Sequence, residues 1–245
     1  VALRDDDPRT DGSGFARLAA AGIATVVGVR AADAARSMAG FLTRRRLGRP
    51  HVTLKLATSL DGCIALTDGT SRWITGPEAR AHAHLERARH EAILVGRRTW
   101  EADDPALDVR LAGLESRSPL RVVLTTRPFV SSAVEKPATS TIQPLLDDAR
   151  SERGPGWHAI GSPAAIADLP GDHVLVEGGA ATAAAFLSAN LVDRLLLYRA
   201  PILIGGGTAA LGNIGLSDLA AAHGRWRLHD SRQLGSDRVE VYEAA

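Results

Sequence analysis

Four clusters of polar residues and glycines, each beside an apolar run, are the parts of this 245-residue sequence that could carry chemistry. In the first, residues 55–62 (KLATSLDG), a lysine stands inside an apolar run that leads into Asp61-Gly62. Burying an unpaired lysine costs free energy, so a buried strand that holds one needs a partner or a ligand. Two interpretations stand: Lys55 pairs within the fold or with a ligand, or its ammonium reaches water past the strand edge.

The second cluster is a polar loop, residues 68–78, that contains Ser71 and Trp73 and leads into Pro77. Proline in the first turn of a helix is an ordinary structural use, so the end of this loop predicts a helix start. The helix start at Pro77 does not explain why a tryptophan, Trp73, stands in this polar loop. A loop tryptophan is suited to cover a planar ligand, and it also packs readily on a core, so both interpretations stay open.

The third cluster, residues 95–110, contains two adjacent carboxylates, Asp103 and Asp104, shortly after an expected strand. Ligands of parallel α/β sheets bind beyond the carboxyl ends of the strands, which would place this pair near a substrate. Asp-Asp-Pro is also a common way to begin a turn. The pair therefore predicts either carboxylates that face a substrate or a purely structural turn.

The fourth cluster, residues 174–187, gives the clearest physical signal. An expected strand ends at Glu177, Gly178 and Gly179 free the backbone for close approach, and a helix of small residues begins at once. The free amide hydrogens and the positive end of that helix predict a phosphate site. The full Gly-x-Gly-x-x-Gly fingerprint is absent, so the conventional dinucleotide motif is only weakly indicated. A second glycine-rich turn, residues 204–208, serves either tight turning or ligand approach.

Composition excludes several classes of function. The formal net charge is +1, with 29 basic and 28 acidic residues intermixed, so no general field favours nucleic acid or an anionic membrane. A single cysteine, Cys63, excludes an internal disulfide and multi-cysteine metal sites, and the eight histidines lack metal-ligand spacing. We therefore expect no metal, no nucleic-acid partner, no membrane partner and a cytoplasmic location. No serine stands in a Gly-x-Ser-x-Gly elbow, which leaves a hydrolase triad without its nucleophile.

Apolar periodicity predicts the elements that must position these clusters. Strands that alternate with helices favour an α/β sandwich on a largely parallel sheet. Two short runs at the end of the chain, joined by a polar turn at residues 234–237, favour an antiparallel pair at the sheet edge. The predicted strands are residues 51–57, 92–95, 120–125, 158–160, 173–176, 195–204 with a break at Pro201, 226–229 and 239–242, and the predicted helices are residues 77–91, 163–169 and 180–190.

The first part of the chain has a different pattern. A basic run that ends at Pro50 disfavours continuation of a helix. We interpret this run as a solvated linker rather than a nucleic-acid site, and place a domain boundary there, between residues 1–48 and residues 49–245. Before it stand a helical stretch, a β-branched run and a longer helical pattern, over residues 15–21, 25–29 and 31–47.

A series of short motifs occurs in a fixed order along the second part: KLATSLDG (55–62), SRWITG (71–76), AILVG (92–96) with Thr99, DDPAL (103–107) with Arg110, EGG (177–179) and APILIGG (200–206). Together they resemble the reductase domain of the bifunctional riboflavin-biosynthesis deaminase/reductase, over about residues 49–242. The resemblance implies a dihydrofolate-reductase-like three-layer sandwich, with a mostly parallel central sheet and an antiparallel C-terminal edge. Residues 1–48 are similar to the closing strands and helix of that family's deaminase domain, which implies a strand at the β-branched run, and they lack its zinc-binding motifs.

The resemblance also implies roles for individual residues. For the family's reaction we assign catalytic functions to Asp103, Lys55 and Glu177, with Asp103 as the proton donor and Lys55 and Glu177 positioning the ribose hydroxyls. Two of the substrate-binding residues are arginines, which suit a ribose phosphate. The implied substrate-binding residues are Ser71, Arg87, Leu107, Arg110 and Glu177, and the implied cofactor-binding residues are Ala57, Trp73, Thr99, Asp103, Thr126, Gly178, Gly179, Ala180, Ala181 and Thr182, with the run continuing to Ala185.

The implied reaction is the reduction of 5-amino-6-(5-phosphoribosylamino)uracil to its 5-phosphoribitylamino product by hydride transfer from NADPH. Thr126 and Arg127 would meet the 2′-phosphate of the cofactor and so favour NADPH over NADH. The family also implies a homodimer. Two alternatives stay open: a dihydrofolate-type reductase of the same fold, and a catalytically silent nucleotide-binding module.

Overall fold

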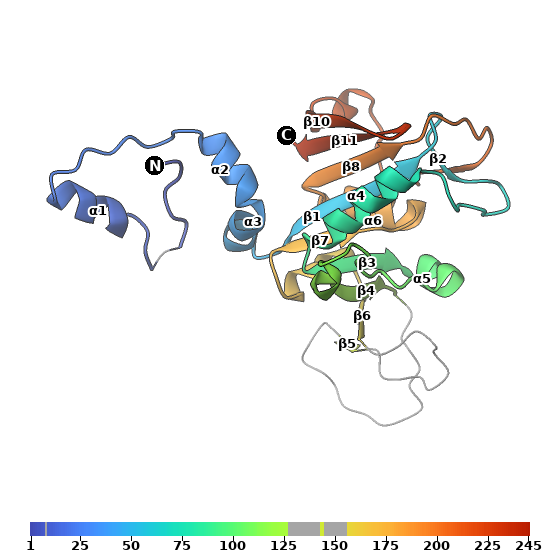
Figure 1. Cartoon of the computed structure of the whole chain (residues 1–245), viewed down its shortest axis with the longest axis horizontal. Coiled ribbons are helices and arrows are strands. Elements are labelled where there is room, and N and C mark those ends of the chain that lie inside the picture. Colours follow the sequence, from blue (N-terminus) through green and yellow to red (C-terminus); the bar gives the residue numbers. More distant parts are fainter. Residues whose placement is uncertain (8, 127–142, 145–155) are drawn as a thin grey trace.

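One large sheet dominates the described part of the chain (Figure 1). The computed structural model describes residues 1–7, 9–126, 143–144 and 156–245. Within them the strand order is β10-β11-β8-β1-β7-β3-β4-β6-β5, and a separate small sheet joins β2 to β9. The strands are β1 (His51–Thr58), β2 (Cys63–Ala65), β3 (Ala92–Gly96), β4 (Leu120–Leu124), β5 (Gln143–Pro144), β6 (Trp157–Ile160), β7 (His173–Val176), β8 (Arg194–Arg199), β9 (Thr208–Ala209), β10 (Trp226–Leu234) and β11 (Asp237–Ala244).

The middle of the sheet is parallel, and its C-terminal edge is antiparallel. The strands β8, β1, β7, β3, β4 and β6 run parallel to one another. At the edge, β11 pairs antiparallel with β8 and with β10. The hairpin turn between β10 and β11 uses Gly235 at a φ of 62°, a left-handed conformation that glycine adopts without strain. The predicted mostly parallel sheet with an antiparallel C-terminal edge is confirmed.

Helices cover both faces of the sheet and complete a three-layer sandwich (Figure 1). Because side chains alternate along a strand, each strand contributes to both faces. On one face Leu54 of β1 belongs to the same buried cluster as Phe186 of α6 (Ala180–Ser188). On the other face Tyr198 of β8 packs with Ala79 of α4 (Pro77–Arg87). Lys55, next to Leu54, therefore points to the α4 face.

Several element boundaries differ from the prediction. The helix α4 ends at Arg87 instead of Glu91, because the Glu86 carbonyl, which the His90 amide would use in a longer helix, accepts from the Arg89 amide at 3.0 Å and lies 2.6 Å from the His90 ring. The strand β8 ends before Pro201, where the chain loses a ladder donor. The predicted helix at residues 163–169 is the 3₁₀-helix η2 (Pro163–Asp168). The helix α5 (Arg97–Asp103) was not predicted from the sequence. Two short 3₁₀-helices, η1 (Glu115–Arg117) and η3 (Ala220–Ala222), are also present.

The N-terminal segment extends from one end of the sheet (Figure 1) and contains α1 (Ser13–Ala20), α2 (Ala31–Ser37) and α3 (Ala39–Leu47). The prediction of one helix over residues 31–47 is wrong, because the chain leaves helical geometry at Met38, where φ is −109°. The β-branched run, expected as a closing strand, is not a strand either. Val26 is 71% exposed, and its carbonyl accepts a hydrogen bond from the terminal amine of Val1. A strand needs a neighbouring strand for its amides, and no described strand lies beside this run.

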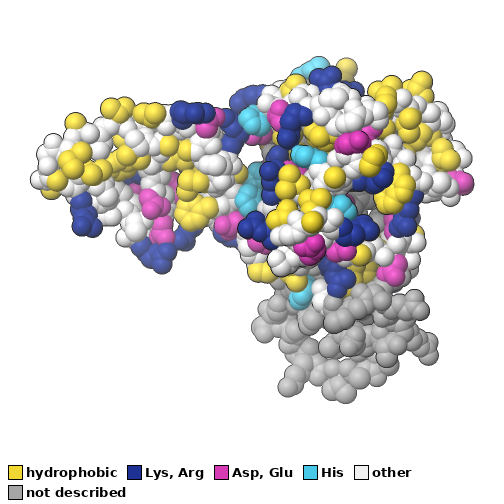
Figure 2. Space-filling view, in the orientation of Figure 1, with side chains coloured by type: hydrophobic (Ala, Val, Ile, Leu, Met, Phe, Trp, Pro, Cys, Tyr) yellow, Lys and Arg dark blue, Asp and Glu magenta, His cyan; other side chains and the backbone are white. Residues whose placement is uncertain are grey.

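Charged side chains of both signs are intermixed over the face of the molecule in Figure 2, in agreement with the formal charge of +1. Among the described residues, no helix combines the length and the apolar character that crossing a membrane requires. The same residues contain no group of three or more histidine, cysteine, aspartate or glutamate side chains placed to hold a metal ion.

The helix α3 attaches the N-terminal segment to the amino end of the sheet. Gly40 lies so close to the imidazole of His173, at the start of β7, that a Cβ on it would be 2.3 Å from Nε2. The His173 ring in turn contacts the rings of His51 and His90, at centroid distances of 5.5 and 5.9 Å. Arg44 adds hydrogen bonds of 2.8 Å to backbone carbonyls around the end of η2.

Replacing Gly40 with alanine should loosen this attachment, because the His173 ring cannot turn away from the new methyl group without displacing its neighbours. We expect Gly40→Ala to lower the free energy of unfolding by about 1–3 kcal/mol, measured by chemical denaturation. Gly14→Ala in α1 is the matched control, since nothing lies within 4 Å of its Cβ position. That control should be neutral or stabilising, and equal stability of the two variants would contradict the packing described.

Candidate active site

A lysine, a glutamate and an arginine meet at the carboxyl end of β7. The strands β1 and β7 are neighbours with Leu54 opposite Val176, so the next residues along them, Lys55 and Glu177, also lie side by side. Both point to the α4 face by the alternation of the strands. Arg87, the last residue of α4, reaches the same carboxylate from the helix layer. The topology therefore brings two cations onto one carboxylate.

Arg87 holds Glu177 with a bidentate pair of hydrogen bonds. Its Nε and Nη2 donate to the two carboxylate oxygens at 2.8 and 3.0 Å, and its Nη1 donates to the Asp108 carbonyl at 3.1 Å. Lys55 Nζ lies 3.8 Å from Glu177 Oε2 and 5.8 Å from the ring centroid of Tyr198. Of the two interpretations of Lys55, pairing within the fold is the correct one.

Electrostatics keep this carboxylate ionised. Burial by itself opposes the charge of Glu177, yet the charges of Lys55 and Arg87 and the hydrogen bonds from Arg87 lower its pKa to about 2. Burial also opposes the charge of Arg87, and Glu177 more than offsets that effect, so the pKa of Arg87 lies above its ordinary value. At neutral pH Glu177 is a hydrogen-bond acceptor and cannot donate a proton.

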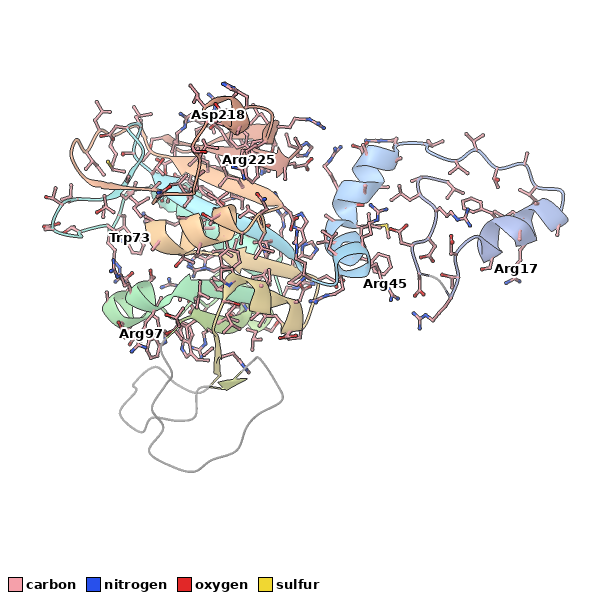
Figure 3. All side chains as sticks on the ribbon, turned by 180° about the vertical axis from the view of Figure 1, so that it is seen from behind. Arg17, Arg45, Trp73, Arg97, Asp218 and Arg225 are labelled. Carbon is pink, nitrogen blue, oxygen red and sulfur yellow. The ribbon has the colours of Figure 1, made fainter. Side chains whose placement is uncertain are left out.

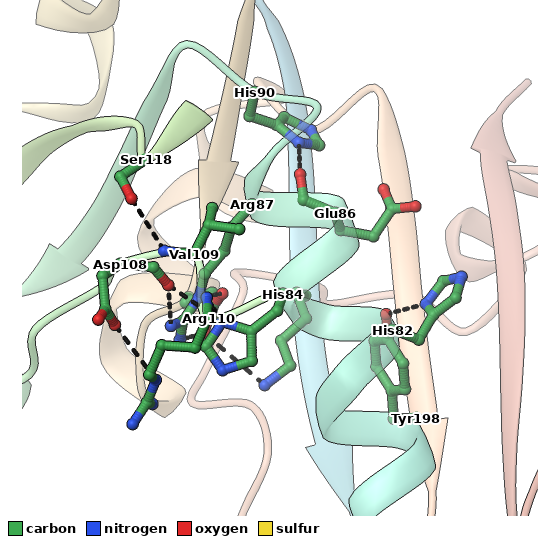
Figure 4. A network of polar contacts seen from close by, with 12 residues as sticks. His82, His84, Glu86, Arg87, His90, Asp108, Val109, Arg110, Ser118 and Tyr198 are labelled. Carbon is green, nitrogen blue, oxygen red and sulfur yellow. Dashed lines mark hydrogen bonds and ion pairs between the residues drawn. The ribbon is translucent and has the colours of Figure 1, made fainter. Parts of the chain in front are cut away.

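A short segment after α5 lies against α4 beside the ion cluster (Figure 4). The Asp108 carbonyl, already bonded to Arg87, lies 3.0 Å from Nδ1 of His84, and the backbone nitrogen of Arg110 lies 3.3 Å from the same atom. Leu107 is buried and adopts a φ of 52°. The Arg110 side chain is 63% exposed and lies 3.4 Å from the Asp108 carboxylate. The structure thus brings Leu107 and Arg110 next to Arg87.

The start of α6 is packed too closely for side chains. A Cβ on Gly178 would lie 2.4 Å from the Cβ of Thr182, and a Cβ on Gly96 would lie 2.1 Å from Thr182 Oγ1. Gly179 is the N-cap residue and no side chain caps the helix. The hydroxyl of Thr99 lies 3.9 Å from the position that a Gly179 Cβ would take. The first amides of α6 therefore begin at the ends of β3 and β7, where the Thr182 side chain fills the space beside Gly96 and Gly178.

The remaining predicted residues lie outside this cluster. Trp73 is 65% exposed, with the Arg80 guanidinium 4.7 Å from its ring centroid, so it does not pack on the core. Figure 3 shows Trp73 at the end of the sheet away from the N-terminal segment. Asp103 is exposed at the end of α5, and its carbonyl accepts a hydrogen bond from Arg72 at 3.1 Å. Ala57 is half-buried in β1, Ser71 and Thr126 are exposed, and Arg127 lies outside the described residues.

The second glycine-rich turn is held in place by Asp61. Its carboxylate accepts hydrogen bonds from the backbone nitrogens of Ile204 and Gly205 at 3.2 and 2.7 Å, and from the Ser59 hydroxyl at 2.5 Å. The bond from Ser59, followed by those from Gly205 and Ile204, lowers the pKa of Asp61 to about 2. Asp61-Gly62 therefore fixes the loop that leads to β9.

Sequence reasoning missed His84 and Asp108. A signal for His84 was present, since it precedes Arg87 by three positions and so lies on the same helix face. Asp108 contributes a main-chain carbonyl that any residue type would supply, so its side chain gave no signal.

The fold has a known counterpart. A dihydrofolate reductase from Enterococcus faecalis, solved with NADP(H) and RAB-propyl, has a TM-score of 0.52 to this chain at 16% identity, covering 79% of this chain and 96% of that one. At this identity the likeness shows the fold alone. The predicted dihydrofolate-reductase-like fold is confirmed.

The chain belongs to the family of the RibD C-terminal domain, whose profile matches residues 50–239. The riboflavin biosynthesis protein RibD of Mycobacterium tuberculosis is 40% identical over 229 residues, which cover 92% of this chain and 64% of that protein. The chain thus spans less than two thirds of this relative. A Thermotoga maritima protein, described as a diaminohydroxyphosphoribosylaminopyrimidine deaminase/5-amino-6-(5-phosphoribosylamino)uracil reductase, has a TM-score of 0.76 at 26% identity, covering 100% of this chain and 70% of that one. The family resemblance predicted from the motifs is confirmed.

Removing the charge of Glu177 should destabilise the fold, because it leaves Arg87 and Lys55 as buried cations without their shared anion. We expect Glu177→Gln to lower the free energy of unfolding by about 3–5 kcal/mol at pH 7. Glu115→Gln, at an exposed carboxylate in η1, is the control for loss of one negative charge and should change it by less than about 0.5 kcal/mol.

The same pair predicts a pH dependence. The pKa of Glu177 falls from 4.5 to about 2 on folding, so its ionisation stabilises the protein fully above pH 4.5 and progressively less as the pH falls toward 2. The stability difference between the parent protein and Glu177→Gln should therefore be constant above pH 5 and shrink below pH 4.5. A difference independent of pH down to pH 3 would contradict the ionised state.

Proposed function

We propose that this chain is an NADPH-dependent oxidoreductase of riboflavin biosynthesis that reduces 5-amino-6-(5-phosphoribosylamino)uracil to its 5-phosphoribitylamino product. The main support is the cluster of Lys55, Glu177 and Arg87 beside the uncapped start of α6. The names of the relatives point the same way, since the Thermotoga maritima protein carries this reductase activity in its description.

The start of α6 fits the phosphates of a dinucleotide. The first-turn amides, residues 180–182, and the positive end of the helix offer donors to an anion, and Gly179 leaves open space, since only the Thr99 hydroxyl lies within 4 Å of its Cβ position. The exposed ring of Trp73 suits a planar group of the cofactor. Thr99 and Ala57 complete the set that would hold it. When bound, the nicotinamide supplies the hydride that C1′ of the ribose accepts.

Preference for NADPH over NADH would come from the end of β4. Thr126 is exposed directly after that strand, where its hydroxyl can donate to a 2′-phosphate. Arg127 follows it in the sequence and would add a charge-assisted contact. Thr126 continues the carboxyl edge at which β7 meets α6, because β4, β3 and β7 are consecutive parallel neighbours.

On the substrate side, Lys55 and Glu177 would orient the ribose hydroxyls, the ammonium as a donor and the carboxylate as an acceptor. Because Glu177 is ionised, the proton required by the sugar oxygen must come from elsewhere. We assign its delivery to Asp103, an exposed carboxyl group at the end of α5. Arg110, with Ser71 and Leu107, would hold the remainder of the substrate.

A dihydrofolate-type reductase is the second candidate, since the fold is shared with a dihydrofolate reductase. The exposed guanidinium of Arg110 beside the ion cluster favours a phosphorylated substrate over a pteridine. A silent nucleotide-binding module is the third. The buried cations around Glu177 argue against it, because such a cluster is expensive to desolvate and brings a binding module no evident benefit.

The expected homodimer and cytoplasmic location rest on the family resemblance and the composition, and both stay predictions. Light scattering of the purified chain measures the first directly. A monomer at micromolar concentration would contradict it.

Substrate choice separates the candidates. We expect NADPH oxidation with the deaminated phosphoribosylamino-pyrimidinedione, and rates at least about tenfold lower with its still-aminated precursor and with dihydrofolate. Faster turnover of dihydrofolate would favour the second candidate. No NADPH oxidation with any of the three would favour the silent module.

The role of Asp103 is tested against its neighbour. Asp103→Asn should lower kcat by about a hundredfold and leave the KM for NADPH within about twofold, because only proton transfer is lost. Asp104→Asn is the matched control and should retain the parent kcat. Equal turnover of both variants would exclude Asp103 as the acid.

A further inference from the structure

The candidate substrate site has one exposed guanidinium where the family resemblance implied two. Arg87 uses all three of its nitrogens on protein acceptors, two on Glu177 and one on the Asp108 carbonyl, and its side chain is 14% exposed. The Arg110 side chain is 63% exposed. A phosphate dianion that binds beside Arg110 therefore needs a second donor from another residue.

His84 is the side chain placed to supply that donor. It lies one helical turn before Arg87 and so faces the same segment (Figure 4). Its Nδ1 lies 3.0 Å from the Asp108 carbonyl, which can only accept, and 3.3 Å from the Arg110 amide, which donates toward the same atom. The two contacts require opposite protonation of Nδ1, and we assign the proton to Nδ1 because the contact with the carbonyl is the shorter. Within the described residues, Nε2 has no hydrogen-bond partner.

Burial and the surrounding cations favour the neutral form of His84 while the site holds no anion. Burial, followed by the charges of Arg87 and Arg110, lowers the pKa of His84, and the carbonyl and carboxylate of Asp108 act weakly in the opposite direction. Glu177 at the end of β7 also interacts with this ring, and that carboxylate is itself compensated by the ammonium of β1. A dianion placed between His84 and Arg110 would reverse the balance and favour the protonated ring.

We propose that His84 is a phosphate-binding residue of the substrate site, which takes up one proton from solvent when the phosphorylated ribose binds. The imidazolium then donates from Nδ1 to the Asp108 carbonyl and from Nε2 to a phosphate oxygen beside Arg110. This inference rests on the proposed function, because it takes the ligand to be a sugar phosphate.

Histidine NMR tests the proton uptake without catalysis. With ¹⁵N-labelled histidine, the titration of His84 should move to higher pH in the presence of ribose 5-phosphate and stay in place with ribose. His223, exposed at the amino end of the sheet, is the internal control and should not respond to either sugar. Binding of ribose 5-phosphate without a change in the His84 titration, or no saturable binding at all, would overturn the proposal.

Kinetics test the contribution to substrate binding. His84→Asn retains a donor near the Asp108 carbonyl and removes the Nε2 donor. At pH 6 it should raise the KM for the phosphorylated substrate about tenfold with little change in kcat, the effect of one charge-assisted hydrogen bond. At pH 8, where less imidazolium forms, the increase should narrow. His223→Asn should match the parent protein at both pH values.

An equal increase in KM at both pH values would assign His84 a merely structural part and overturn the proposal. The failure of the proposed function looks different. If the parent protein oxidises no NADPH with the substrate, the reductase assignment fails, while the histidine titration with ribose 5-phosphate still decides the role of His84.

Discussion

The arrangement of the candidate site depends on one buried carboxylate held between two cations. Glu177 needs a cation beside it, because a buried carboxylate without one would leave an uncompensated charge in a poorly solvated place, and the fold supplies two, Lys55 and Arg87. Meeting this requirement fixes β1 beside β7 and fixes the end of α4 above them. It also fixes the segment after α5, since the third nitrogen of Arg87 holds the Asp108 carbonyl. The ion cluster of Lys55, Glu177 and Arg87 thereby positions the elements that surround the candidate site.

A single strand end connects the two halves of that site. Glu177 faces α4 and the proposed substrate groups, while the next two residues, Gly178 and Gly179, turn the chain into α6 and the proposed phosphate donors. The close packing of Gly178 on Thr182 leaves little freedom between them. The hydride donor and the sugar would therefore be aligned by the same short stretch of backbone, which suits a reaction that depends on the distance between two carbons.

The spacing of apolar residues along the chain was sufficient to predict the α/β layers and the sheet. Central parallel strands are apolar throughout, whereas apolar and polar residues alternate along the strands of the C-terminal edge. The interactions of Lys55 could not be chosen from the sequence, since its partner stands 122 positions away in the numbering and meets it only through strand order. Arg87 was expected to bind the ribose phosphate, and in the structure its guanidinium forms hydrogen bonds to Glu177. The break at Met38 and the unpaired β-branched run were missed because both depend on neighbours outside their own local pattern.

The most direct measurement of the central claim is a crystal structure of this chain soaked with NADPH. The account predicts difference density for the diphosphate at the amides of residues 180–182, with the nicotinamide on the side of β7 where Lys55 and Glu177 lie. Density for the dinucleotide at any other edge of the sheet, with the start of α6 bound only by water, would contradict it.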